Sequence, residues 1–268
     1  MTAGNGFSQK NRGAALVTGA ARRLGRAMAL YLAGRGHAVA IHYDQSADEA
    51  ESVAAEARAM GVPAQAFQAD LLDEATVRGL IPAVTAALGP LSVLVNNASI
   101  FEYDTIRTAT PEGWERHMRS NLSAPFWLMQ DFAAQVAPAD RSGSEPRASG
   151  LIVNMVDQRV LKPTPEFMTY SLAKAALWSL TRTAAQALAP DIRVNAIGPG
   201  PTLRGSRQSQ AHFDRQRTAT ILERGADAQD VTAALGYFLG ADSVTGQLIC
   251  VDGGQHLGWR TPDVLGVE

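Results

Sequence analysis

The stretch Ala14-Ala15-Leu16-Val17-Thr18-Gly19-Ala20-Ala21-Arg22-Arg23-Leu24-Gly25 decides the fold of this chain. Its first four residues are apolar and typical of a short buried strand, and residues 24–35 have the pattern of a helix. Backbone N–H groups at the start of a helix attract anions, and glycines let a phosphate approach closely. The turn therefore predicts a pyrophosphate site built from Gly19, Arg22, Arg23, Leu24 and Gly25, with a purely structural turn as the alternative.

The same alternation continues to the end of the chain. Further apolar runs predict strands at 38–43, 64–69, 91–95, 151–155, 192–197 and 248–251, and helical patterns occupy 47–60, 73–88, 111–136 and 166–188. Near-continuous apolar strands separated by helices indicate a parallel sheet covered on both faces. We therefore predict an α/β fold with a doubly wound sheet of seven strands. It forms one domain over residues 13–268, after a flexible N-terminus at 1–12.

Composition and charge narrow the range of partners. The chain has 268 residues, of which 46% are hydrophobic and 19% charged, so it can bury a large core. A net charge of −2 argues against a nucleic-acid or anionic-membrane surface. A single cysteine fits a reducing compartment, and the sequence has neither a signal peptide nor a long apolar span. We expect a cytoplasmic protein that acts on a small molecule, with no nucleic-acid or membrane partner.

Tyr170 and Lys174 carry the clearest chemical signal. They stand four residues apart in a predicted helix, so they share one face. An ammonium held beside a phenol favours the phenolate and lowers the phenol pKa. Such a phenol can exchange a proton with a carbonyl or imine while a hydride arrives from elsewhere. Together with the turn at 18–25, this pair predicts a nicotinamide-dependent reductase.

Asp157 follows the predicted strand 151–155 and precedes the helix of Tyr170. A carboxylate beside the tyrosine would repel the alkoxide-like oxygen of a simple ketone reduction. It would suit a substrate whose reacting nitrogen needs a proton and whose ring edge is rich in N–H donors. We predict a catalytic role for Asp157, and the alternative is that it caps a turn after the strand.

Two short segments after other strands extend the predicted cofactor site. Asp70 and Leu71 follow the strand 64–69, where an acid can bind the adenine amino group, with a helix N-cap as the alternative for Asp70. Asn97, Ala98 and Ser99 follow the strand 91–95 and place amides and small side chains beside the ribose, with a plain turn as the alternative.

Two further segments complete the predicted site. Asn121 lies among apolar residues of the predicted helix 111–136, where it either holds a water or bends the helix for a proton relay, or is a hydrogen-bonded core residue. Pro199 and Gly200 can pass close to the nicotinamide carboxamide. They open the segment 198–225, which follows a strand's carboxyl end and is predicted to be a substrate lid rather than an ordinary loop. No histidine has metal-ligand spacing, so we predict no catalytic metal.

The end of the second predicted strand bears on the choice of coenzyme. Tyr43 stands where an acid would bind the ribose hydroxyls of NAD, and Ser46 can donate to a phosphate. Arg22 and Arg23 in the neighbouring turn can pair with a phosphate. These residues favour NADPH, whereas Asp44 keeps NADH as the alternative.

The chain resembles the short-chain dehydrogenases/reductases from residue 14 to about 254. The resemblance rests on the Tyr170–Lys174 pair, Asn121, residues 96–98 and the Gly19/Gly25 turn. It implies a single Rossmann-type domain and a homotetramer. It also implies that the tyrosine is the acid, that the lysine sets its pKa and anchors the ribose, and that the asparagine joins a water relay.

At two positions the chain departs from that pattern, and there it is similar to the pteridine reductases and the bacterial dihydromonapterin reductases. Arg23 replaces the usual middle glycine of the turn, and Asp157 replaces the usual serine. The resemblance implies that Phe101 stacks on a pterin, that Ser99 contacts it, and that Arg23 approaches both pterin and cofactor phosphate. Tyr170 and Asp157 would deliver protons while NADPH delivers hydride. Core packing is the alternative role for Phe101.

Three alternative functions are consistent with these residues. The first is reduction of a dihydropterin to a tetrahydropterin with NADPH. The second is a carbonyl or quinone reductase, or an alcohol dehydrogenase, that tolerates Asp157 in place of serine. The third is a cofactor-binding protein without turnover.

Overall fold

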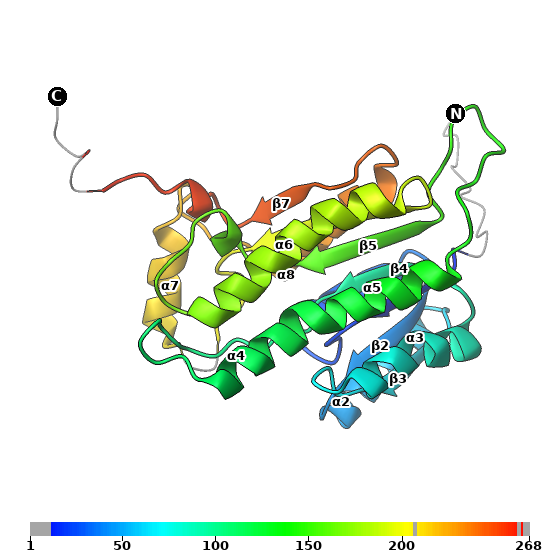
Figure 1. Cartoon of the computed structure of the whole chain (residues 1–268), viewed down its shortest axis with the longest axis horizontal. Helices are drawn as coiled ribbons and strands as arrows, with labels where there is room; N and C mark the ends of the chain where they lie inside the picture. The colour runs from blue at the N-terminus through cyan, green and yellow to red at the C-terminus, as the bar shows by residue number, and fades with distance from the viewer. Residues whose placement is uncertain (1–11, 206–207, 262–263, 265–268) are drawn as a thin grey trace.

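A computed structural model describes residues 12–205, 208–261 and 264 of the chain. Seven parallel strands form one sheet in the order β3-β2-β1-β4-β5-β6-β7 (Figure 1). The strands are β1 (Ala14–Val17), β2 (Ala38–Tyr43), β3 (Ala64–Gln68), β4 (Leu91–Asn96), β5 (Gly150–Met155), β6 (Ile192–Pro199) and β7 (Leu248–Val251). The predicted parallel sheet is confirmed. Most of the predicted flexible segment 1–12 lies outside the described residues.

The strand order reverses direction between β1 and β4. Val17 at the end of β1 is in register with both Ile41 of β2 and Val95 of β4, so the carboxyl ends of these strands meet at one edge. The chain winds outward in both directions from this point. In such sheets, ligands bind in the crevice outside the carboxyl ends at the reversal. The fold therefore directs attention to the loops that follow β1, β4, β5 and β6.

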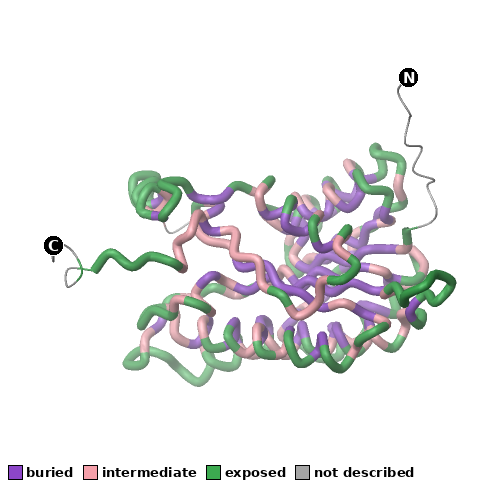
Figure 2. The backbone as a smooth tube through the Cα atoms, turned by 90° about the horizontal axis from the view of Figure 1, so that it is seen from above, coloured by how far each residue is buried: buried purple, intermediate pink, exposed green. Residues whose placement is uncertain are grey.

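Helices cover both faces of the sheet. One layer contains α1 (Arg23–Ala33), α2 (Ala47–Ala59) and α8 (Ala228–Gly240), and the other contains α3 (Glu74–Leu88), α5 (Ala124–Gln135) and α6 (Met168–Leu188). Figure 2 shows the buried strands enclosed between helices whose outer sides are exposed. Phe238 and Phe132 are fully buried, one in each layer. Each such side chain contributes about 1.5–3 kcal/mol through burial.

The predicted helix 111–136 is in fact three elements. They are α4 (Pro111–Met118), the π-helical turn η1 (Arg119–Ser123) and α5. Pro125 has no N–H to donate to the carbonyl of Asn121 four residues earlier, so the regular α-helical bond is lost at this place. A π-turn accommodates that loss. The sequence analysis took 111–136 as one helix, whereas the residues buried before and within the turn, His117, Ser120 and Asn121, are polar.

Two helices lie where no helix was predicted. α7 (Gln210–Thr218) lies within the predicted lid segment, and α8 covers the sheet before β7. Short 3-10 turns occur at η2 (Gln158–Val160) and η3 (Gln255–Leu257). In Figure 1 the arrows of β5 and β7 point toward α7, which therefore lies beyond the carboxyl edge of the sheet. Among the helices of the described residues, none has the length and apolar character needed to cross a bilayer.

Candidate active site

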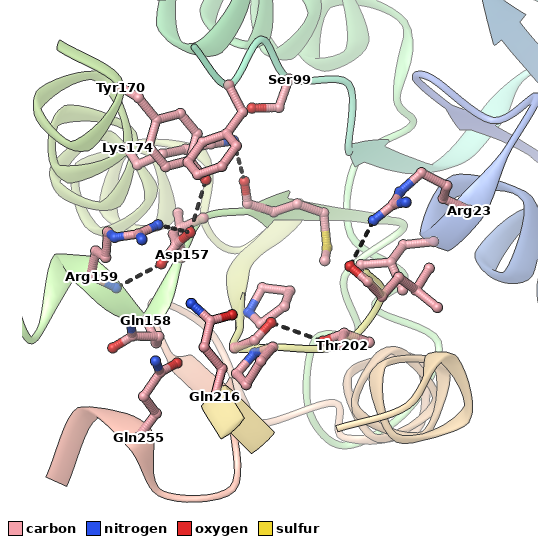
Figure 3. Close-up of a pocket in the computed structure, with 18 of the residues that line it drawn as sticks. Arg23, Ser99, Asp157, Gln158, Arg159, Tyr170, Lys174, Thr202, Gln216 and Gln255 are labelled. Carbon is pink, nitrogen blue, oxygen red and sulfur yellow. Dashed lines mark hydrogen bonds and ion pairs between the residues drawn. The ribbon is translucent and has the colours of Figure 1, made fainter. Parts of the chain in front are cut away.

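A cavity of about 330 Å³ opens at the carboxyl edge of the sheet (Figure 3). It brings together ten of the predicted site residues: Arg23, Leu24, Asn97, Ser99, Phe101, Asp157, Tyr170, Lys174, Pro199 and Gly200. They come from the turn after β1, the loop after β4, the segment after β5, the helix α6 and the end of β6. Sequence segments far apart in the chain therefore meet at the place that the strand order indicates.

Tyr170 and Asp157 contact each other directly within this cavity. The Tyr170 hydroxyl donates to Asp157 Oδ2 over 3.0 Å. Lys174 Nζ donates to the carbonyl oxygen of Met155 over 2.7 Å and lies 5.8 Å from the centre of the Tyr170 ring. Both Tyr170 and Lys174 are buried, on one face of α6 as predicted. Tyr170 and Asp157 thus form a hydrogen-bonded pair of ionisable groups, with the buried Lys174 ammonium near the Tyr170 ring.

The expected lowering of the Tyr170 pKa is wrong for this arrangement. Burial and the Asp157 carboxylate raise the pKa of Tyr170 well above its ordinary value, and Arg159 offsets only part of that shift. Burial also lowers the pKa of Lys174 to about 8, against the opposing effect of Asp157. The phenol faces a carboxylate more closely than it faces the ammonium. Tyr170 is therefore held in its protonated, proton-donating form.

Asp157 has two roles at once. Its Oδ1 accepts a 2.9 Å hydrogen bond from the backbone N–H of Arg159 and so caps the 3-10 turn η2. Its Oδ2 accepts from Tyr170 and lies 3.5 Å from an Arg159 guanidinium nitrogen. The capping role that the sequence left as an alternative is real, and it orients the carboxylate toward Tyr170.

Phe101 belongs to an aromatic cluster at the mouth of the cavity. Its ring stacks on Phe167 at 4.2 Å between centres and meets Tyr170 edge-on at 4.7 Å. Phe101 is 40% exposed, so the alternative that it is a core residue is wrong. Phe167 has a left-handed backbone, with a φ of 54°, and supports the Phe101 ring, a contact that the sequence did not reveal.

Asn121 supports the loop that carries Phe101. Its Oδ1 accepts from the backbone N–H of Ile100, and its Nδ2 donates to the Ile100 carbonyl, each over 2.9 Å. The side chain is almost fully buried within the π-turn. Of the alternatives, the hydrogen-bonded core residue is what the structure shows. The side chain holds residues 99–101 in place behind the cavity.

The turn after β1 suits a phosphate group. α1 begins without a side-chain cap and without an acidic residue in its first turn, so its first N–H groups are available to an anion. A Cβ atom on Gly25 would lie 2.2 Å from the carbonyl oxygen of Gly19, so only glycine permits the close packing of this turn. Asn97 Nδ2 donates to the carbonyl of Thr18 over 2.8 Å and ties the loop after β4 to the same turn.

His42 supports the turn after β1, a role that the sequence analysis did not assign to it. Its Nδ1 accepts from the Gly19 N–H and its Nε2 faces the carbonyl of Ala69, both at 3.0 Å. Burial lowers the His42 pKa to about 4, so the imidazole is neutral near pH 7. The neutral ring bridges the turn after β1 and the loop after β3. A polar residue inside an apolar strand was the available signal.

The residues predicted to bind the adenosine half lie outside the cavity described above. Tyr43 ends β2 and Ser46 is the N-cap residue of α2, whereas Asp70 and Leu71 follow β3. Asp70 is not the N-cap of α3, because Asp73 has that role and Asp70 Oδ1 accepts from the Leu72 N–H. Arg22 forms an exposed ion pair with Glu49.

Described residues of the segment 198–225 line one side of the cavity. Arg23 donates from its two terminal nitrogens to the carbonyl oxygens of Leu203 and Arg204, each over 2.9 Å. Arg23 has a φ of 54°, the left-handed region that favours the glycine usual at this place. The cofactor turn and the predicted lid are thus joined by one side chain. The same segment also contributes wall residues that the sequence missed, namely Pro201, Thr202, Leu203, Gln208, Phe213 and Gln216.

Other wall residues were also missed because they have no motif. Gln158 and Arg159 follow Asp157 directly, and Gln255 comes from η3. In Figure 3 the glutamines Gln158, Gln216 and Gln255 gather on one side of the cavity, away from Arg23. Within the described residues, no group of three or more His, Cys, Asp or Glu residues is arranged to hold a metal ion.

Solved structures resemble this fold over nearly the whole chain. The FolM alternative dihydrofolate reductase 1 of Brucella suis, solved in complex with NADP, is 44% identical, with a TM-score of 0.87 over 94% of this chain and 98% of that one. The FolM protein of Brucella canis, complexed with NADP, is 42% identical, with a TM-score of 0.88 over 95% of this chain and 100% of that one.

Curated relatives point to two different substrates. Pteridine reductase 1 of Leishmania tarentolae is 34% identical over 91% of this chain and 96% of its own length. The 3-oxoacyl-[acyl-carrier-protein] reductase FabG of Staphylococcus aureus is 33% identical over 91% of this chain and 98% of its own. Residues 13–214 match the family described as short chain dehydrogenase. With its seven-stranded sheet and its tyrosine–lysine pair, the chain belongs to the short-chain dehydrogenase/reductase family of oxidoreductases.

Proposed function

We propose that this protein reduces a dihydropterin to a tetrahydropterin with NADPH. The observation that carries the proposal is the 3.0 Å hydrogen bond from the Tyr170 hydroxyl to Asp157 Oδ2. A neutral donor beside the tyrosine would serve a ketone, whereas a carboxylate serves a substrate with N–H groups on its ring edge. A pterin ring presents such groups next to the nitrogen that must be protonated.

The residues around the turn after β1 fit a dinucleotide with a phosphorylated ribose. The uncapped start of α1 would bind the pyrophosphate, and Asn97, Ala98 and Ser99 would lie beside the ribose. Ser46, Arg22 and Arg23 would take the additional phosphate, and Asp70 and Leu71 the adenine. When bound, the reduced nicotinamide supplies a hydride. The NADP complexes of the two FolM proteins support NADPH over NADH.

Proton delivery falls to the chain's own side chains. Tyr170, kept protonated by burial and by Asp157, donates to the substrate nitrogen. Lys174 lies behind it, where its ammonium stabilises the negative charge that the pair carries after the proton leaves. The same lysine would anchor the ribose close to Pro199 and Gly200. Asn121 keeps the loop of residues 99–101 in position on the other side of the ring.

The substrate would lie in a slot between the aromatic cluster and the cofactor. Phe101 offers a ring for stacking, with its orientation fixed by Phe167 and Tyr170. Ser99 and Arg23 line the same cavity and can donate to acceptors on the substrate. The segment 198–225 would act as the lid, because Arg23 already connects it to the cofactor turn.

Reduction of a ketone or quinone is the second candidate. The chain is almost as similar to FabG as to pteridine reductase 1, and this similarity supports the second candidate. Under this alternative, Asp157 replaces serine without a role in protonation. Replacement of Asp157 by serine then leaves turnover unchanged or raises it, which is the opposite of the expectation for a dihydropterin.

The assembly that we propose is a cytoplasmic homotetramer. A second hollow, of about 280 Å³, lies between α5 and α6 and is lined by apolar side chains that include Phe126, Met129 and Leu180. Phe126 is 40% exposed in the single chain. Association of two copies through this face would bury it. Sedimentation equilibrium of the wild type and of Phe126→Glu tests the assembly, and a monomeric wild type would contradict it.

The experiment measures oxidation of NADPH, and separately of NADH, with dihydrobiopterin, dihydromonapterin, dihydrofolate and a set of ketones and quinones. We expect turnover of a dihydropterin that falls at least about a hundredfold in Tyr170→Phe and Asp157→Ser. Tyr103→Phe, an exposed tyrosine, is the matched control. Turnover of ketones alone, retained in Asp157→Ser, would overturn the proposal. Binding of NADPH without turnover of any substrate would identify a non-catalytic protein.

A further inference from the structure

Arg159 stands at the junction of the proton-donating pair and the aromatic cluster. Its backbone N–H donates to Asp157 Oδ1 over 2.9 Å, and its guanidinium lies 3.5 Å from Asp157 Oδ2. In Figure 3 the side chains of Arg159, Asp157 and Tyr170 point toward one another. The same arginine therefore contacts both oxygens of the carboxylate that accepts from Tyr170.

The guanidinium also lies over two aromatic rings. Its central carbon is 5.5 Å from the centre of the Phe101 ring and 5.1 Å from that of Phe167. Both distances are within the range of a cation–π interaction. Because Phe101 and Phe167 are stacked, the arginine contacts the two rings as a pair. The charge that faces Asp157 and the contact that orients Phe101 thus belong to one side chain.

Neither side chain of the Arg159–Asp157 ion pair is freely exposed to solvent. The exposed fractions of the Arg159 and Asp157 side chains are 21% and 17%. The Arg159 Nε is buried and has no hydrogen-bond partner among the described residues. A buried guanidinium N–H without a partner is costly, so the gain must come from the charge and from the ring contacts. Solvent screening of the Arg159–Asp157 interaction is correspondingly weak.

We propose that Arg159 is the positioning residue of this active site, which holds the Asp157 carboxylate against Tyr170 and holds Phe101 in the orientation that receives the substrate ring. The inference rests on the proposed function for the nature of that ring, but the Asp157 part applies to any substrate. No covalent role is implied, because the guanidinium stays protonated throughout.

The other charged groups around Asp157 do not replace Arg159. α6 contributes Tyr170 and Lys174, and Lys174 is directed to the Met155 carbonyl. β7 contributes Cys250, whose thiol pKa is raised to about 12, so it is neutral. Among the described residues that line the cavity, β6 and η3 contribute Pro199 and Gln255, which carry no charge. Removal of Arg159 therefore leaves the Tyr170–Asp157 pair with Lys174 as its nearest cation.

The two roles can be separated with three variants. Arg159→Gln removes the charge and the ring contact, Arg159→Lys keeps the charge, and Phe167→Leu removes one ring without changing any charge. A cation favours the deprotonated form of a neighbouring pair, so its loss raises the apparent pKa of that pair. We expect the pH profile of kcat/KM to move about one unit to higher pH in Arg159→Gln. The profile should remain in place in Arg159→Lys and Phe167→Leu.

Loss of the contact between Arg159 and the two aromatic rings should change the KM rather than the pH profile. Loss of a cation–π contact raises the KM for a ring substrate about threefold, in Arg159→Gln and in Phe167→Leu. The NADPH dissociation constant and the melting temperature report on folding in each variant. If Arg159→Gln does not fold, Arg159→Lys and Phe167→Leu still test the inference, since a shifted profile in either contradicts it.

An unchanged profile in folded Arg159→Gln would overturn the inference. So would a rise in KM confined to anionic substrates such as dihydrofolate, because it would make Arg159 an anion-binding residue. The proposed function fails separately, if the wild type turns over no dihydropterin. In that case the profile is measured with the ketone or quinone that is turned over, and a shift in Arg159→Gln still supports the positioning role.

Discussion

His42 Nδ1 accepts a 3.0 Å hydrogen bond from the backbone N–H of Gly19, so a neutral imidazole holds the turn in which the cofactor site is built. Protonation of Nδ1 would replace the acceptor by a second donor and break this bond. The other ring nitrogen faces the Ala69 carbonyl over 3.0 Å, which fixes the tautomer as Nε2–H. The stability of the turn is therefore linked to pH.

The first prediction concerns this linkage. The folded pKa of His42, about 4, lies below its ordinary value of 6.5, so the unfolded chain binds the proton more tightly. The contribution is fully present above pH 6.5 and is lost as pH falls toward 4. We expect about 2 kcal/mol of this stability to be lost between pH 7.5 and pH 5. Urea unfolding at fixed protein concentration measures it.

His42→Asn is the control for this prediction, because an amide can donate and accept but does not titrate. The difference in unfolding free energy between the wild type and His42→Asn should narrow as the pH falls from 7.5 to 5. A difference that stays constant would show that His42 does not account for the acid sensitivity.

The second prediction concerns the left-handed backbone of Arg23. A residue with a side chain in this region costs about 1–2 kcal/mol relative to glycine. Arg23→Gly should therefore be more stable than Arg23→Ala by about 1 kcal/mol, although both lose the hydrogen bonds to Leu203 and Arg204. Both should raise the KM for the substrate, since the proposed lid loses its link to the turn. Thermal unfolding measures the stabilities of the two variants, and steady-state kinetics measure their KM. Equal stabilities of Arg23→Gly and Arg23→Ala would contradict the strain at this position.

The third prediction concerns the exposed ion pair between Arg22 and Glu49. The carboxylate competes with a phosphate for the guanidinium and repels that phosphate. Glu49→Gln should tighten NADPH binding about threefold, with NADH binding unchanged, and the gain should shrink at high salt. Glu56→Gln, which breaks the similar Arg26–Glu56 pair on the same helix, is the matched control. An equal gain for NADH in a fluorescence titration would rule out competition for the phosphate.

The fourth prediction concerns Asn121. Asn121→Ala leaves the N–H and the carbonyl of Ile100 without their partners, at a cost of about 2 kcal/mol in the free energy of unfolding. The loop carrying Phe101 loosens, so kcat/KM should fall more than the affinity for NADPH. Asn121→Asp keeps the acceptor but turns a buried carboxylate oxygen toward the Ile100 carbonyl, so it should be no better than Asn121→Ala. Kinetics and cofactor titration of both variants check this order.

The fold could be predicted from the sequence because its signals are local. Each buried strand is a short apolar run bounded by turn residues, as in Ala14–Val17 and Gly150–Met155. The cavity residues at the carboxyl edge followed from the same pattern, because the ends of parallel strands meet. The helix α8 was missed although it is strongly apolar, and the interruption at η1 was missed because residues 111–136 were taken as one continuous helical pattern.

The chemistry of the site was less accessible to sequence reasoning. The spacing of Tyr170 and Lys174 gave the correct shared face but the wrong direction for the Tyr170 pKa. That direction is set first by the burial of Tyr170 and then by the charge nearest to it, which is the Asp157 carboxylate. Arg159, Phe167 and His42 have no motif, and their contacts arise only when distant elements pack together.

The π-turn at residues 119–123 has a consequence for how this chain can change. A π-turn is in effect a one-residue insertion into a continuous helix, and it turns every residue before it by about 100° relative to those after it. Deleting any one residue there would restore regular helix and swing Asn121 away from Ile100, even if Asn121 itself were kept. The support of residues 99–101 therefore depends on the number of residues in the turn as well as on the identity of Asn121, so a deletion there differs in its effect from a substitution.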